Sequence, residues 1–180
     1  MPKGEVAYRR YLDGDDEGLV SIIEDYRDAL ILFLCGVVGN VDAAEEIAEE
    51  TFFILAAKRP RYSGKSSFKT WLYAIAKNTA CKEIKRHLNK TELTDEVPYD
   101  ASLEESVIKG ERERTLAAAL RRISPDYREV LHLVYLEDFS NGEAAKVMKK
   151  SKKQIENLLA RAKGALRREL QKEGFTYENL

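Results

Sequence analysis

The sequence predicts an all-α fold in which two small helical domains are joined by a flexible linker. Apolar residues recur every three or four positions through most of the chain, the spacing that gives a helix one buried face. This periodicity stops over residues 91–102, TELTDEVPYDAS, a stretch that is acidic, contains a proline and has no apolar period. We therefore expect a four-helix N-terminal domain over residues 1–90, a linker over residues 91–102 and a C-terminal helix-turn-helix domain over residues 103–180.

The N-terminal domain begins with a mostly polar stretch, residues 5–16, which predicts a short helix or a loose lead-in. The first long helix follows, because apolar residues keep helical spacing over residues 19–37, and Gly39 ends it. Asp42 is expected to be the N-cap of the next helix, in a capping box with Glu45.

Pro60 stops this second helix, and either serine of Ser66-Ser67 can cap a third. In the third helix the spacing of Trp71 with its apolar neighbours favours a core position, whereas Tyr73 on the other face is expected to be the exposed aromatic. Asn78-Thr79 is expected to separate this helix from a fourth, basic one. The short links predict a compact domain.

The C-terminal domain shows the pattern of a helix-turn-helix. A helical pattern runs over residues 103–123, and Ser124-Pro125 marks the start of the next helix. A short apolar helix over residues 142–148, a turn at residues 149–151 and a long basic helix complete the pattern.

Charges are arranged in blocks, although the net charge is only −1. Residues 1–57 carry four bases and thirteen acids, and residues 58–90 carry ten bases and one acid. Residues 91–142 carry six bases and twelve acids, and residues 143–180 carry ten bases and five acids. Two basic blocks separated by acidic sequence favour a protein that contacts a phosphate backbone at two places.

The longest apolar run, residues 29–38, is shorter than the ~20 residues that span a bilayer, and it lacks the flanks of a signal peptide. Cys35 and Cys81 lie in apolar helical patterns, which favours buried, reduced thiols over a disulfide or a redox sensor. We expect a cytoplasmic protein.

The sequence offers no catalytic or metal-binding constellation. His87 and His132 have no metal-ligand company and are expected at the surface or an edge. Gly64-Lys65-Ser66 lacks the earlier glycine and the strand of a phosphate-binding loop. Because no serine, cysteine or carboxylate stands with a base and an orienting group, we expect neither enzymatic activity nor a cofactor.

The chain resembles the extracytoplasmic-function (ECF) group of the sigma-70 family of bacterial RNA polymerase sigma factors. Residues 42–52, DAAEEIAEETF, are similar to the family's core-polymerase-binding helix. Residues 66–86, SSFKTWLYAIAKNTACKEIKR, are similar to its minus-ten recognition and melting segment. Residues 124–166, SPDYREVLHLVYLEDFSNGEAAKVMKKSKKQIENLLARAKGAL, are similar to its minus-thirty-five helix-turn-helix.

The resemblance implies that residues 1–90 are sigma region 2 and residues 103–180 are sigma region 4. Docking on the clamp helices of the large polymerase subunit would use Glu46, Glu49, Glu50 and Phe52. Minus-ten DNA would be bound by Lys69, Tyr73, Lys77, Asn78, Thr79, Lys82, Lys85 and Arg86, with Asn78 and Thr79 in a loop beside a flipped base. Minus-thirty-five DNA would be bound by Lys152, Lys153, Gln154, Asn157, Arg161 and Lys163.

Four positions depart from the family pattern. Glu49 stands where glutamine is usual, and Glu156 and Leu158 replace positions that are commonly basic or polar. Glu156 would repel phosphate or accept a hydrogen bond from a cytosine amino group. Lys149 stands where a turn glycine is usual, so a left-handed backbone there would be strained.

The implied function is that of an alternative sigma factor, a non-catalytic subunit that binds core RNA polymerase and directs promoter-specific initiation. It would be a monomer when free, and an anti-sigma factor is a candidate partner. Two other functions stay open. One is a stand-alone helix-turn-helix regulator that reads two half-sites as a dimer. The other is a sigma-like adaptor that binds polymerase without initiating transcription.

Overall fold

The computed structural model describes residues 3–90 and 110–174, and every element in these two ranges is a helix. The N-terminal half holds α1 (Lys3–Leu12), α2 (Glu17–Val38), α3 (Val41–Lys58) and α4 (Phe68–Lys90). The C-terminal half holds α6 (Glu111–Arg122), α7 (Pro125–Leu131), the π-helical turn η1 (His132–Leu136), α8 (Asn141–Met148) and α9 (Lys152–Lys172). The all-α class is confirmed. The expected linker and residues 103–109 lie outside the described residues.

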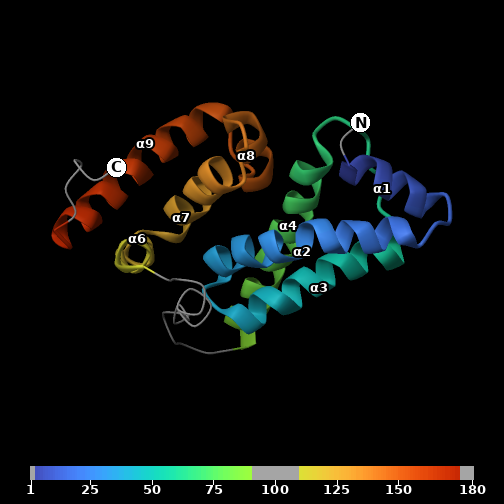
Figure 1. Ribbon diagram of the computed structural model, residues 1–180, viewed down its shortest axis with the longest axis horizontal. Coiled ribbons are helices and arrows are strands. Elements are labelled where there is room, and N and C mark those ends of the chain that lie inside the picture. The colour runs from blue at the N-terminus through green and yellow to red at the C-terminus, as the bar shows by residue number, and fades with distance from the viewer. Residues whose placement is uncertain (1–2, 91–109, 175–180) are drawn as a thin grey trace.

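The two halves lie against each other. In Figure 1, α2 and α3 run side by side while α4 crosses them, and α7 and α8 lie beside the N-terminal half. The most extensive contacts between the described halves are those of α8 with α4 and of α7 and η1 with α2. The C-terminal half therefore packs on the same helix, α4, that carries most of the basic residues of the first basic block.

Local signals set most helix ends. Gly39 adopts a left-handed conformation, φ 73°, and its N–H donates to the Cys35 carbonyl at 2.8 Å, which ends α2. Asn40 then caps α3, its Oδ1 accepting from the Ala43 N–H at 2.8 Å. The expectation that Asp42 is the N-cap was wrong, because the tight turn at Gly39 makes Asn40 the one extended residue before the helix.

Helix α4 is continuous, so the expected break at Asn78-Thr79 was wrong. It begins after Ser67, whose hydroxyl accepts from the Thr70 N–H at 3.2 Å, as expected for a capping serine. The Thr79 hydroxyl donates to the Ile75 carbonyl at 3.0 Å within the helix. Asparagine and threonine cost less than about 1 kcal/mol each in a helix, and burial of Thr79 and Ala80 against other helices outweighs that cost.

Aromatic side chains fill the core between α1, the 59–67 loop and the start of α4. Tyr8 is fully buried, its hydroxyl donates to the Pro60 carbonyl at 2.7 Å, and its ring centroid lies 5.2 Å from that of Trp71. Trp71 also packs against Tyr62 and Phe68. The lead-in is thus a packed helix, and Trp71, expected in the core, is partly buried and packs against it.

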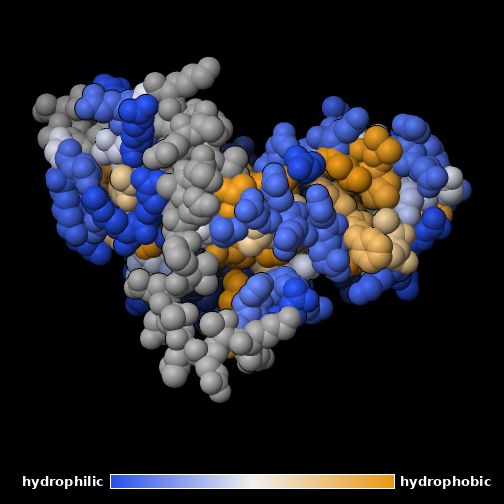
Figure 2. All heavy atoms as spheres, turned by 90° about the horizontal axis from the view of Figure 1, so that it is seen from below, coloured by the Kyte–Doolittle hydropathy of each residue, from blue (hydrophilic) through white to orange (hydrophobic). Residues whose placement is uncertain are grey.

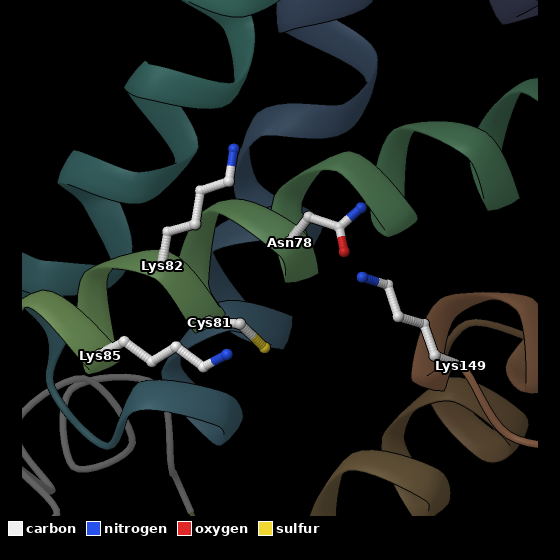
Figure 3. A pocket seen from close by; sticks show the side chains of 5 residues that line it. All are labelled: Asn78, Cys81, Lys82, Lys85 and Lys149. Atoms are coloured by element: carbon white, nitrogen blue, oxygen red, sulfur yellow. The ribbon is translucent and has the colours of Figure 1, made fainter.

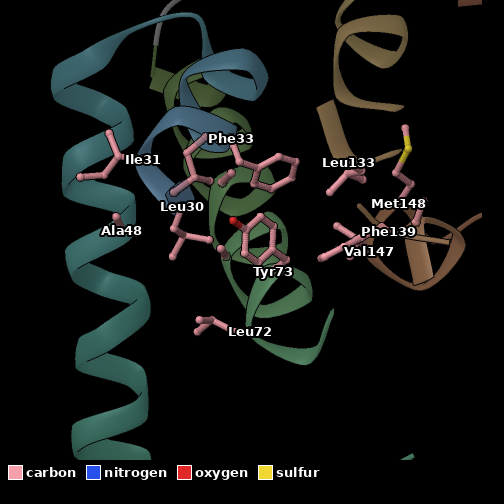
Figure 4. Packing of buried hydrophobic residues seen from close by; sticks show 14 of the residues in the cluster. Leu30, Ile31, Phe33, Ala48, Leu72, Tyr73, Leu133, Phe139, Val147 and Met148 are labelled. Atoms are coloured by element: carbon pink, nitrogen blue, oxygen red, sulfur yellow. The ribbon is translucent and has the colours of Figure 1, made fainter. Parts of the chain in front are cut away.

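A second group of apolar side chains joins the two halves. Tyr73 lies between Phe33 of α2, at 5.1 Å between ring centroids, and Phe139 of the C-terminal half, at 5.3 Å. Figure 4 shows Leu133, Val147 and Met148 on the far side of this contact. The expectation that Tyr73 is exposed was wrong, since it is fully buried between these two rings.

Candidate polymerase and nucleic-acid interfaces

Helix α3 presents an acidic outer face. Glu46, Glu49 and Glu50 are all exposed, and none forms an ion pair within the described ranges, whereas Glu45 lies 3.9 Å from Arg27. Glu49 and Glu50 follow Glu46 by three and four residues, so both lie on the side of the helix that Glu46 faces. Seen from below in Figure 2, hydrophobic side chains gather at the right, over the end of the molecule that holds α1 and α3 in Figure 1.

The aromatic residue on this face is Phe53 and not Phe52. Phe52 is 7% exposed and belongs to the core, while Phe53 is 60% exposed. The spacing could have separated them, because Phe53 follows Glu46 by seven residues and Glu49 by four, which places it on the acidic side. Phe52 instead follows Ala48 by four and continues the buried stripe. An exposed phenylalanine beside three unpaired carboxylates suits a protein partner.

Two lysines of α4 expected at minus-ten DNA pair with carboxylates of the C-terminal half. Lys69 Nζ lies 2.7 Å from Glu137 Oε2 and also donates to the Glu137 carbonyl at 2.9 Å. Lys77 Nζ donates to Glu129 Oε2, and the Lys77 side chain is only 18% exposed. Both ammonium groups therefore already have anionic partners.

The two carboxylates differ in their electrostatic environment. Burial tends to raise the pKa of Glu137, but hydrogen bonds from His132 and Lys69 outweigh it and hold that pKa at about 2. Burial raises the pKa of Glu129, with Lys77 opposing the shift, and its second oxygen has no hydrogen-bond partner among the described residues. The carboxylate of Glu137 therefore has more hydrogen-bond partners than that of Glu129. His132, expected at the surface or an edge, lies in this contact with its ring centroid 5.7 Å from that of Phe33.

A third carboxylate of the C-terminal half joins the contact. Glu143 Oε1 accepts hydrogen bonds from the hydroxyls of Ser67 and Thr70, each at 3.1 Å. Its other oxygen accepts from the Ser140 N–H at 3.0 Å, in the capping box that starts α8. Burial tends to raise the pKa of Glu143, but these hydrogen bonds lower it below its usual value.

The second half of α4 borders an open pocket of about 410 Å³. Asn78, Cys81, Lys82 and Lys85 line it from α4, and Lys149 lines it from the end of α8 (Figure 3). Within the described residues, no carboxylate forms an ion pair with these three lysines. The pocket is therefore a cationic surface that suits phosphate groups. Arg86, one turn further, is largely exposed and pairs with Glu83 at 2.6 Å.

Two of the other residues expected at minus-ten DNA are turned inward. Thr79 is 6% exposed with its hydroxyl bound inside the helix, and Tyr73 lies in the core. Since no loop interrupts α4, Asn78 is the residue that remains available beside the pocket. Burial and the nearby charge of Glu137 raise the pKa of Tyr73, whose hydroxyl has no partner in hydrogen-bonding geometry among the described residues.

The helix-turn-helix pattern is confirmed in α8, a tight turn and α9. Ser151 caps α9 in a capping box with Gln154, whose Oε1 accepts from the Ser151 N–H at 2.7 Å. Ile155 and Ala162 point inward and are fully buried. The remaining surface of α9 is exposed and includes Glu156. It also holds all six residues expected at minus-thirty-five DNA: Lys152, Lys153, Gln154, Asn157, Arg161 and Lys163.

Two details modify this surface. The side-chain oxygen of Gln154 is engaged in the cap, which leaves only its amino group for a base edge. Lys163 Nζ lies 5.2 Å from the centre of the Tyr135 ring, a cation–π contact that holds it near η1. Lys149 has φ 53° and ψ 44°, the left-handed turn conformation that glycine adopts without strain.

The described residues hold neither a metal site nor a membrane-spanning helix. No group of histidine, cysteine and carboxylate side chains in the described ranges suits a metal ion. Cys35 and Cys81, expected to be buried, are half-buried, and they form no disulfide with each other. No described helix is both long enough and apolar enough to cross a bilayer.

Both halves of the chain match models of known protein families. Residues 22–89 match the model of sigma-70 region 2, and residues 113–166 match that of sigma-70 region 4. The chain is 25% identical to the ECF RNA polymerase sigma factor SigW of Bacillus subtilis, covering 87% of this chain and 91% of SigW. It is 30% identical to the ECF sigma factor BldN of Streptomyces coelicolor, covering 86% of this chain and 61% of BldN.

Solved structures show the same fold. The sigma factor RpoE of Bartonella quintana, in complex with the anti-sigma factor NepR, is 20% identical with a TM-score of 0.66, covering 84% of this chain and 95% of RpoE. CnrH, in complex with the cytosolic domain of CnrY, is 20% identical with a TM-score of 0.69, covering 94% of this chain and 97% of CnrH. With both region models matched in the family's order, the chain belongs to the ECF group of the sigma-70 family of RNA polymerase sigma factors.

Proposed function

We propose that this chain is an alternative sigma factor whose α3 face binds core RNA polymerase while α4 and α9 bind promoter DNA. The observation that carries the proposal is the separation of charge onto distinct exposed faces, acidic on α3 and basic on α9 and the second half of α4. A single promoter-binding subunit needs one surface for a protein and two for a polyanion. The proposed domains are region 2 over residues 1–90 and region 4 over residues 103–180, with residues 91–102 between them.

The polymerase surface consists of Glu46, Glu49, Glu50 and Phe53. Phe53 takes the place of the expected Phe52 in this surface, because the Phe52 side chain is 7% exposed and offers a partner almost no area. Clustered carboxylates steer a basic partner helix into place, and the exposed ring adds apolar area at the centre.

The minus-ten surface lies along α4. Lys69, Lys77, Lys82, Lys85 and Arg86 are the proposed phosphate ligands, since each binds a phosphate oxygen as a point charge or fork. Asn78 is the proposed contact to an unstacked base, because it borders the cationic pocket. Thr79 and Tyr73 are left out of direct DNA contact, since both are buried.

The minus-thirty-five surface is the exposed side of α9. Lys152 and Lys153 at its start suit phosphates, while Asn157 and Arg161 reach base edges as adenine and guanine ligands. The chain acts without catalysis of its own and works in the cytoplasm, where promoter DNA and polymerase are. An anti-sigma factor is a candidate regulator of the same surfaces.

Run-off transcription with purified core polymerase on a library of promoter fragments tests the function. We expect transcripts from a subset of fragments that share two elements, and only when both chain and polymerase are present. Specific duplex binding by a dimer without polymerase would instead indicate a stand-alone regulator. Polymerase binding with no transcript from any fragment would indicate an adaptor. Either result would overturn the proposal.

A further inference from the structure

A pocket between α4 and the end of α8 brings together lysines from the two halves of the chain. Helix α4 lines it with Asn78, Cys81, Lys82 and Lys85, and the end of α8 lines it with Lys149 (Figure 3). We refer to these five residues as the lysine pocket. Cys81, Lys82 and Lys85 follow Asn78 by three, four and seven positions, so all four share one face of α4.

No described carboxylate forms an ion pair with the lysine pocket. In the first half of α4 the lysines pair with carboxylates of the C-terminal half, as Lys69 does with Glu137 at 2.7 Å. In the second half of α4, Glu83 pairs with Arg86 at 2.6 Å. The three lysines of the pocket have no such partner among the described residues. Because like charges gathered at one cavity repel each other, a bound anion would stabilise this arrangement.

Lys149 lies at the pocket in a backbone conformation that disfavours a lysine. Its φ of 53° and ψ of 44° are angles that glycine adopts without strain. Its neighbour Lys150 lies 3.2 Å from Asp126, whereas the Lys149 side chain extends toward Asn78 of α4 (Figure 3). A glycine would relieve the strain of the turn and remove the charge that the end of α8 contributes. The lysine thus serves the pocket and not the turn.

The size and lining of the pocket select a class of ligand. Its volume of about 410 Å³ lies in the range of small-molecule sites and is far too small for a DNA duplex. Lysine ammonium groups only donate hydrogen bonds, and phosphate oxygens accept them strongly. The described lining includes no aromatic side chain on which a base could stack. Three lysines from two helices therefore suit a compact anion with several charges.

We propose that the lysine pocket binds a small anion with two or more linked phosphate groups, held by Lys82 and Lys85 from α4 and by Lys149 from α8. The site does not depend on the proposed function, because Lys149 belongs to neither proposed DNA surface. Lys82 and Lys85 do belong to the proposed minus-ten surface, so the bound anion and promoter DNA would exclude each other there.

Inorganic pyrophosphate is the probe, and the Cys81 thiol reports where it binds. Isothermal titration calorimetry of the full chain in magnesium-free buffer measures the affinity. Alkylation by uncharged iodoacetamide, followed by peptide mass spectrometry, measures the reactivity of Cys81 and Cys35 separately. We expect saturable binding that slows alkylation of Cys81 and leaves Cys35, which does not line the pocket, unchanged. Inorganic phosphate, with a single phosphate group, should bind at least about tenfold more weakly.

Variants of two lysines on α8 separate the pocket from overall charge. Lys149→Gln should weaken pyrophosphate binding about tenfold through loss of one charge-assisted hydrogen bond, and Lys149→Arg should retain most of the affinity. The matched control is Lys146→Gln. It removes the same charge three residues earlier, where the ammonium group donates to the Lys65 carbonyl at 2.9 Å and does not line the pocket. Equal losses in both glutamine variants would overturn the proposal.

Two further results would overturn it. One is the absence of saturable pyrophosphate binding below about 1 mM. The other is protection of Cys81 by a short single-stranded DNA and not by pyrophosphate, which would assign the pocket to promoter DNA. Circular dichroism checks that each variant is folded. None of these measurements involves polymerase, so a failure of this proposal is distinct from a failure of the run-off transcription test.

Discussion

Phe52 and Phe53 are neighbours in sequence with opposite surroundings, and this difference separates stability from partner binding. Phe52→Ala should lower the free energy of unfolding by about 3–5 kcal/mol, because it empties a buried site. Phe53→Ala should change it by less than about 0.5 kcal/mol and weaken binding to core polymerase. Urea unfolding and co-purification with polymerase measure the two effects. If both variants bind polymerase as the wild type does, Phe53 is not part of the polymerase contact.

The Glu137 carboxylate predicts a pH dependence of stability. Its pKa is lowered from 4.5 to about 2 in the folded chain, so its contribution to stability is fully present above pH ~4.5 and is lost as pH falls toward 2. At neutral pH the free energy of unfolding of the wild type should exceed that of Glu137→Gln by up to about 3 kcal/mol. The difference between the two proteins, measured by denaturant unfolding at several pH values, should shrink below pH ~4.5. A constant difference down to pH ~3 would contradict this.

Lys149 sits in the turn of the helix-turn-helix with a left-handed backbone, so this element carries local strain. Lys149→Gly should raise the free energy of unfolding by about 1 kcal/mol, because glycine has no Cβ to clash. Lys149→Ala is the matched control: it removes the same charge near Lys82 and Lys85 but keeps the Cβ. Thermal unfolding should distinguish them. Equal stabilisation by both would point to charge repulsion and not to backbone strain.

Helix α4 shows how an element differs from the sum of its residues. Asn78 and Thr79 are weak helix formers and commonly found at helix ends, which is why the sequence favours a break there. The structure keeps them helical because residues on both sides are buried: Ala76 and Ala80 are fully covered. A base that contacts Asn78 would therefore meet the side of a rigid helix and not a flexible loop.

The molecule as a whole presents its polymerase and DNA surfaces on separate helices, so each can be changed alone. Reversing Glu46, Glu49 and Glu50 to lysine should reduce association with core polymerase at least ~tenfold through loss of charge complementarity. The same reversal at Glu24, Asp25 and Asp28 on α2, also exposed, should leave association nearly unchanged. Co-purification measures both. Wild-type association and initiation by the α3 variant would contradict the proposed polymerase surface.

Short-range signals located most of the fold. The signals at the helix ends all act within one helical turn. They are the left-handed Gly39, the proline after α3, Ser67, Ser124-Pro125 and the capping serines of α8 and α9. The blocks of charge in the sequence likewise predict which helices carry the acidic and basic surfaces. The environment of Tyr73 depends on other helices that the local pattern does not reveal, whereas the spacing within α3 alone separates Phe52 from Phe53.

By itself the sequence determined the helical class, the order of the elements and which stretches are acidic or basic, because these depend on residues a few positions apart. Only the tertiary structure decided that Lys69 and Lys77 face Glu137 and Glu129, residues more than fifty positions away along the chain. Pairing across that distance depends on how α7, η1 and α8 pack against α2 and α4. Burial and the partner charge therefore set the chemistry of each lysine, and neither can be read from its sequence neighbours.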